Sequence, residues 1–186
     1  MNFKTTARTI AAIAALVALP LIARAATTPV TPHPLGVEFG FNWTTNSTTQ
    51  QFAHTLYDFQ LDYDVTGGKG PIPISAYGQY GWASTKPIGG VNVNYNEWQF
   101  GVQAQTRTQI YGGLGVGYIG QNGNVSLSGV GSASASTSGV GGTVFLGADL
   151  HKPNQSGPGI KLGYNVWPNF QSLNTDNWYA ALTYRI

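Results

Sequence analysis

The last nine residues of the chain alternate strictly between apolar and other side chains. Trp178, Ala180, Leu182, Tyr184 and Ile186 share one parity. Alternation with a period of two is the pattern of a β-strand with one apolar face. Because chain ends commonly fray, a fully patterned terminal strand indicates that this segment closes a sheet.

The same alternation recurs in seven earlier segments, so the sequence predicts eight strands. Named by their first and last apolar positions, the expected strands are 35–43, 57–65, 74–82, 98–104, 110–118, 140–150, 160–166 and 178–186. Short strands separated by turn-rich connections favour an antiparallel barrel. The connection 120–142 is rich in Gly and Ser, and we expect it to be a mobile loop.

The first 25 residues have the pattern of a secretory signal peptide. Lys4 and Arg8 supply a positive start, 10–22 is an apolar stretch, and Ala23-Arg24-Ala25 is an A-x-A cleavage site. The apolar stretch is shorter than the roughly 20 residues that a spanning helix needs. We therefore expect a signal peptide at 1–25.

The mature chain divides into a Pro-rich periplasmic leader, 26–34, and a single barrel domain, 35–186. Charged residues make up 9% of the sequence, whereas soluble domains carry roughly 25%. Removal of the signal peptide leaves six of the nine Lys and Arg residues against seven Asp and Glu. This balance excludes a basic surface for nucleic acid.

Two observations place the apolar face of the predicted strands against lipid. The first is size: 14 of the 22 aromatic residues after the signal peptide lie on this face, and an eight-stranded barrel is too narrow to enclose them. The second is charge: none of the 13 charged residues of the mature chain lies on it. A Lys or Arg facing lipid at mid-depth costs about 2–4 kcal/mol, so a bilayer enforces such purity.

The connections predict how the barrel is oriented. Those after the odd-numbered strands are the longer ones, and long loops face outward in known membrane barrels. Both chain ends then lie on the periplasmic side. Trp43, Trp82, Trp98 and Trp178 fall at the outer ends of their strands, where amphipathic rings settle at a membrane interface and form an aromatic girdle.

With these features the sequence resembles the small eight-stranded outer-membrane barrels, the group of the OmpA transmembrane domain and OmpX. The resemblance covers 35–186 and rests on strand count, loop asymmetry, aromatic placement and the terminal strand. It implies an all-β, antiparallel, up-and-down transmembrane β-barrel in the outer membrane of a Gram-negative cell. Its expected partners are membrane lipid and the assembly machinery, which recognises the C-terminal strand. Ile186 stands where the chains of this group usually end in Phe. We expect the protein to be a monomer.

Charged residues on the polar face gather toward the periplasmic end of the predicted lumen. They are Glu38, Asp62, Asp64, Asp149, Lys161 and Arg185. Because desolvated carboxylates are costly unless paired, we predict an ion-pair network that plugs the lumen. A gated or narrow ion path lined by the same charges is the alternative. Asp58, Asp62 and Asp64 also have the chemistry of a hard-cation site, but ion-pair partners are closer to hand, and no metal is expected.

Catalytic chemistry finds little support in the histidines. His33 lies in the leader, His54 in the first outer loop and His151 at an inner turn. Acyl transfer needs a nucleophile beside a base, and none of the three has the His-x-Ser arrangement of the lipid A deacylase type. His54 has Thr and Ser neighbours, yet a solvated loop histidine is the simpler interpretation. We expect neither catalytic residues nor a cofactor.

The sequence therefore predicts a non-enzymatic outer-membrane barrel with a polar, plugged lumen and long surface loops. Its role would be envelope structure or surface interaction, with an extracellular partner bound through the loops. Three alternatives stay open from the sequence: a small passive pore, a lipid-modifying enzyme, and a secreted soluble barrel of lipocalin type that carries a ligand inside.

Overall fold

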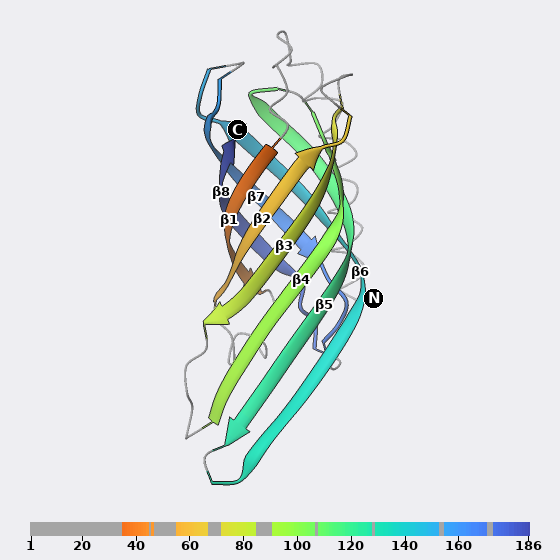
Figure 1. Cartoon of the computed structure of the whole chain (residues 1–186), viewed down its shortest axis with the longest axis vertical. Helices are drawn as coiled ribbons and strands as arrows, with labels where there is room; N and C mark the ends of the chain where they lie inside the picture. Colours follow the sequence, from red (N-terminus) through yellow and green to blue (C-terminus); the bar gives the residue numbers. More distant parts are fainter. Residues whose placement is uncertain are drawn as a thin grey trace.

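Eight strands form one closed barrel, in which each strand pairs with the next and the last pairs with the first (Figure 1). The computed structural model describes residues 35–44, 46, 55–66, 72–84, 91–106, 108–127, 129–152, 155–170 and 173–186. No helix in these ranges is long and apolar enough to cross a membrane. The predicted antiparallel up-and-down fold is confirmed, whereas the signal peptide and the leader lie outside the described residues.

The strand boundaries are as follows: β1 is Leu35–Thr44, β2 Thr55–Asp64, β3 Ile74–Ser84, β4 Val91–Gln105, β5 Ile110–Leu127, β6 Gly131–Asp149, β7 Gly157–Val166 and β8 Asn177–Arg185. Closure depends on the terminal strand, which pairs antiparallel with both β1 and β7. The backbone N–H of Ile186 donates to the carbonyl of Leu35 across 2.9 Å, so the pairing continues to the last residue. The patterned C-terminus therefore closes the sheet, as its alternation predicts.

The two ends of the barrel differ. The terminal end, at the top of Figure 1, holds Leu35 and Ile186. The hairpin end, at the bottom, is where β5 turns into β6. All of the odd-numbered strands run toward the hairpin end because neighbouring strands are antiparallel.

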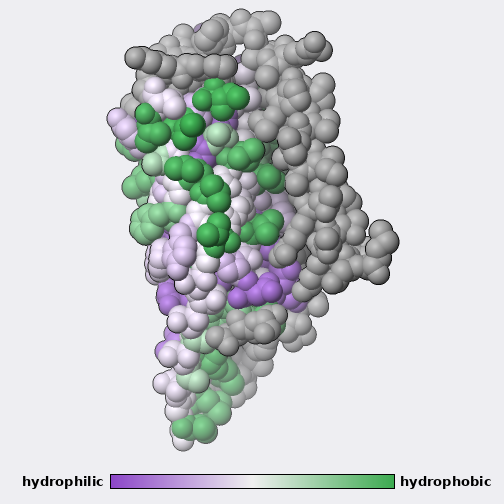
Figure 2. All heavy atoms as spheres, turned by 90° about the vertical axis from the view of Figure 1, so that its right-hand side faces the viewer, coloured by the Kyte–Doolittle hydropathy of each residue, from purple (hydrophilic) through white to green (hydrophobic). Residues whose placement is uncertain are grey.

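Apolar side chains cover the outside of the barrel wall. Phe100 is 64% exposed and Leu182 62%, whereas Glu38 is only 5% exposed. Figure 2 shows hydrophobic side chains over the upper part of one flank, a band of hydrophilic ones below them, and hydrophobic ones again at the tip of the hairpin end. Rings outside and carboxylates inside are the reverse of a soluble lipocalin-type barrel, so that alternative is wrong for the barrel wall.

Three strands are much longer than the sequence pattern suggests. β4, β5 and β6 contain 15, 18 and 19 residues, and together they project beyond the other strands at the hairpin end (Figure 1). The predicted mobile loop at 120–142 is therefore wrong: the segment forms a β-hairpin in which β5 continues to Leu127 and β6 begins at Gly131. The expected long connection at 83–97 is likewise shortened, because β4 already begins at Val91.

In this projecting part the two faces exchange polarity. The inner face carries the apolar residues Val91, Val93, Tyr95, Val125, Ala133 and Ala135. The outer face carries the polar residues Asn92, Asn94, Asn96, Asn122, Asn124, Ser132, Ser134, Ser136 and Ser138. The exchange occurs where Trp98 pairs with Gly120 and Gly120 with Ser138. An outward polar face is adapted to water, so this level marks the edge of the hydrocarbon layer.

Candidate functional site

Glu38 on β1 and Lys161 on β7 meet inside the barrel. The Lys161 ammonium donates to Oε1 of Glu38, and both side chains are almost fully buried. The same ammonium lies 4.3 Å from the centre of the Phe145 ring, within the range of a cation–π interaction. The pair thus links two strands that are not hydrogen-bonded neighbours, since β8 lies between β1 and β7.

Arg185 on β8 lies between two carboxylates nearer the terminal end. Its Nη1 is 3.6 Å from Oδ2 of Asp62, and its Nε is 3.9 Å from Oδ1 of Asp149. The guanidinium carbon also lies 5.4 Å from the centre of the Tyr111 ring. Gly36 stands opposite Asp62, and its missing side chain leaves the room that this carboxylate occupies, because a Cβ there would lie 2.5 Å from Oδ1.

The other two carboxylates of β2 are held by hydrogen bonds. Asp64 accepts from the backbone N–H and the hydroxyl of Thr66 at 2.8 and 2.5 Å. Asp58 accepts from the side-chain amide of Asn42. Over the part of the chain that the structure describes, no group of His, Cys, Asp and Glu is arranged to hold a metal ion.

Four aromatic rings also point into the lumen, where the alternation of apolar residues predicts none of them. They are Tyr77, Tyr111, Phe145 and Tyr179. Each stands opposite a glycine of a neighbouring strand: Tyr77 opposite Gly101, Tyr111 opposite Gly147, Phe145 opposite Gly113 and Gly163, and Tyr179 opposite Gly163. A glycine beside each ring removes the Cβ that would collide with it, so a narrow barrel can hold them. In the sequence, the only sign of these inward rings is the set of glycines on the polar faces of the neighbouring strands.

The four predicted girdle tryptophans lie on the outer face toward the hairpin end. Trp43 stands directly opposite Trp178. Trp82 stacks on Tyr57 with ring centres 6.1 Å apart, and Trp98 lies 6.0 Å from Tyr118. These contacts form belt-like aromatic clusters on the outer wall, the arrangement that suits a membrane interface.

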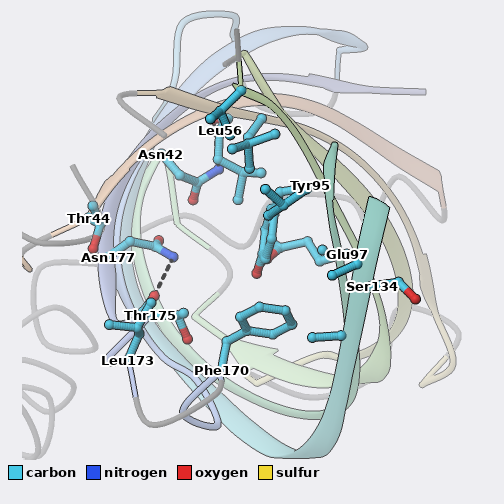
Figure 3. Close-up of a pocket in the computed structure, with 17 residues that line it drawn as sticks. Asn42, Thr44, Leu56, Tyr95, Glu97, Ser134, Phe170, Leu173, Thr175 and Asn177 are labelled. Carbon is cyan, nitrogen blue, oxygen red and sulfur yellow. Dashed lines mark hydrogen bonds between the residues drawn. The ribbon is translucent and has the colours of Figure 1, made fainter. Parts of the chain in front are cut away.

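A cavity of about 370 Å³ opens at the hairpin end (Figure 3). Tyr95 and Phe170 point into it, with ring centres 5.8 Å apart at a nearly perpendicular angle. Phe170 packs against Gly123, where a Cβ would lie 2.9 Å from the ring. The remaining wall is largely apolar, while Asn42, Asn177 and other polar side chains face it from β1 and β8.

Glu97 is the charged residue on this wall, although the strands predicted at 74–82 and 98–104 leave it in a connection. It belongs to β4, opposite Gly81, and only 2% of it is exposed. Its Oε2 accepts from the Tyr95 hydroxyl at 2.9 Å. Its Oε1 is buried without a hydrogen-bond partner among the described residues.

Of the three histidines, only His151 falls within the described residues. Its Nδ1 lies 3.0 Å from the carbonyl of Lys152, and its Nε2 lies 3.8 Å from Oδ1 of Asp149. These contacts hold the ring beside the turn that leaves β6, at the terminal end. His33 and His54 lie outside the described residues.

Comparisons with known proteins agree with this architecture. A family model described as outer membrane protein beta-barrel domain matches residues 10–185. A comparison with curated proteins found no match.

Two solved barrels illustrate the structural likeness. Ail, the attachment invasion locus protein of Yersinia pestis, solved with the heparin analogue sucrose octasulfate, is 11% identical with a TM-score of 0.58, over 82% of this chain and 95% of that one. The N-terminal β-barrel domain of Pseudomonas aeruginosa OprF is 12% identical with a TM-score of 0.51, over 83% and 98%. At these identities the likeness shows the fold alone. The match of the family model over nearly the whole sequence shows that the chain belongs to the outer membrane protein β-barrel domain family and is a protein of the bacterial outer membrane.

Proposed function

We propose that this protein is a non-enzymatic outer-membrane barrel with a plugged lumen, serving envelope structure or surface interaction. The observation that carries the proposal is the packing at mid-barrel, where the space around Glu38, Lys161 and Tyr179 is only about 10 Å³. A single water molecule needs roughly 10–15 Å³, so this space is small for a hydrated ion, which supports a closed lumen.

The charges of the plug support closure as well as the packing. Lys161 contacts Glu38, and Arg185 lies between Asp62 and Asp149, so each cation sits beside a carboxylate of another strand. Buried ion pairs with further contacts hold their geometry, because separating them leaves charges unpaired in a low-dielectric interior. The network therefore acts as a structural closure rather than as a row of exchangeable ion sites.

Surface interaction would take place at the hairpin end, which faces the cell exterior in the predicted orientation. The solved Ail complex contains a polyanionic heparin analogue. The described cations of this chain, Lys152, Lys161 and Arg185, lie at mid-barrel or toward the terminal end, so the described part of the hairpin end does not offer a comparable anion site. We propose lipid as the partner of the outer wall, the assembly machinery as the partner of β8, and a monomer.

Planar-bilayer conductance tests the closure. The mature chain, folded and checked by heat-modifiable gel migration, is expected to give no steady current. A steady open current in the wild type would contradict the plug and favour the passive pore.

The double variant Glu38→Ala with Lys161→Ala shortens both side chains of the central pair, and we expect it to pass measurably more current than the wild type. Phe100→Ala, on the lipid-facing wall, is the matched control and should stay closed. If the double variant is as silent as the control, the central pair does not carry the closure.

Absence of enzymatic activity is tested separately. Lipopolysaccharide and phospholipid incubated with the folded barrel should keep their acyl chains when analysed by mass spectrometry. A shift in mass that matches the loss or transfer of an acyl group would contradict this part of the proposal.

A further inference from the structure

The inner wall of the projecting strands is apolar although it does not face lipid. Val91 and Val93 of β4 and Val125 of β5 line the cavity at the hairpin end. Asn92 and Asn94, on the other face of β4, are exposed. With water outside, the membrane gives no reason for an apolar inner wall. Apolar surface around an open cavity is stabilised when something apolar fills it, and ligand sites typically combine such walls with a few polar groups.

The cavity also contains an acceptor without a donor. Glu97 is 2% exposed, and its Oε1 has no hydrogen-bond partner among the described residues. A buried, unpaired carboxylate oxygen is costly. Of the described cations, Lys161 contacts Glu38 and Arg185 lies between Asp62 and Asp149. A bound ammonium group would supply the donor that Oε1 of Glu97 lacks among the described residues.

The aromatic rings beside Glu97 also favour a positively charged group. Tyr95 donates its hydroxyl to Oε2, and its ring lies against that of Phe170 (Figure 3). The faces of aromatic rings attract cations. A volume of about 370 Å³ suits a molecule with one or two rings or a short alkyl chain.

We propose that this cavity binds a small amphipathic amine. Its apolar body lies between Tyr95, Phe170 and the valine side chains, and its ammonium group donates to Oε1 of Glu97. Binding at the hairpin end goes beyond the proposed function, because the ion pairs that close the lumen need no ligand. A conducting wild type would therefore refute the plug and leave this site untouched, and failure of the amine to bind would leave the plug untouched.

Isothermal titration of the mature barrel in lipid nanodiscs tests the proposal, with empty nanodiscs as the reference. The probe is 1-naphthylmethylamine, compared with 1-naphthylmethanol and 1-naphthoate. We expect the amine to bind about tenfold more tightly than the alcohol, since a charge-assisted hydrogen bond adds to the same apolar contact, and the carboxylate not to bind measurably. Equal affinity for amine and alcohol, or no heat beyond empty nanodiscs, overturns the proposal.

Three variants locate the site, each checked for folding by heat-modifiable migration. Glu97→Gln keeps the shape and should weaken amine binding about tenfold while leaving the alcohol unchanged. Ala135→Phe fills the cavity and should abolish binding of both. Ser136→Phe places the same ring on the opposite face of β6 and should bind like the wild type. If Glu97→Gln keeps the preference for the amine, or if Ala135→Phe binds like Ser136→Phe, the site is not the one proposed.

Discussion

At the scale of single residues, the lumen is built by matching large side chains to missing ones. Gly147 illustrates this, because it stands opposite Tyr111 and a Cβ at this position would lie 2.5 Å from Cε2 of the ring. Tyr111 is only 1% exposed, so the ring has little room to move away. Glycine is required here by space rather than by backbone conformation.

Gly147→Ala should therefore destabilise the barrel by about 1–3 kcal/mol through overpacking, measured as the free energy of unfolding in urea. In a Tyr111→Leu background the same change should have little further effect, since the clashing ring is gone. Gly142→Ala is the matched control on the same strand, because its nearest neighbour would be 3.4 Å away. If Gly147→Ala lowers the free energy of unfolding no more than Gly142→Ala does, the Tyr111 ring can move to make room.

Sequence parity predicts which charged residues face the lumen, because Glu38 and Lys161 fall on the polar face of their strands and are buried in the structure. It does not predict the inward rings. The number of aromatic residues indicates that the apolar face of the strands meets lipid. Tyr111 and Tyr179 are aromatic but lie on the opposite face. Their accommodation depends on Gly147 and Gly163 of neighbouring strands, a relation visible only once the register is known.

At the scale of elements, the sequence predicts the order and the faces of the strands correctly but the lengths of three of them wrongly. The alternation in β4 does not stop at Trp98; its apolar parity changes there, from even positions to Val91, Val93 and Tyr95. If a strand is identified by apolar residues at every second position, this change from even to odd positions looks like the end of the strand. In β6 the Ser and Ala residues alternate with so little contrast that the segment resembles a flexible linker.

The proposed membrane edge at Trp98 gives a prediction for two positions on the outer face of β4. Val102→Arg should lower the free energy of unfolding in lipid vesicles by about 2–4 kcal/mol, because the charge would face hydrocarbon. Asn94→Arg should change it by less than about 0.5 kcal/mol, as at other exposed sites. Similar losses at both positions would mean that the projecting strands also lie at membrane depth.

At the scale of the whole molecule, the strand pairing of the barrel does not depend on the projection. Gln121 pairs with Thr137, so the wall between this level and the terminal end is complete without the residues beyond it. We expect that replacing 122–136 by an Asn-Gly turn leaves a folded barrel that still migrates in a heat-modifiable way, but that no longer binds the amine. Loss of the heat-modifiable band would show that the projection is needed for folding.

The exchange of polarity between the two strand faces on the hairpin side of Trp98 also restricts how thick a bilayer this protein can span. Asn96 and Asn122 begin the outward polar surface on the hairpin side of Trp98, so a thicker membrane would submerge amide groups instead of meeting further apolar wall. Hydrophobic mismatch would then have to be relieved by thinning the lipid around β4, β5 and β6. The bacterial outer membrane is thinner than the average bilayer, so it would submerge less of this polar surface than a thicker membrane would.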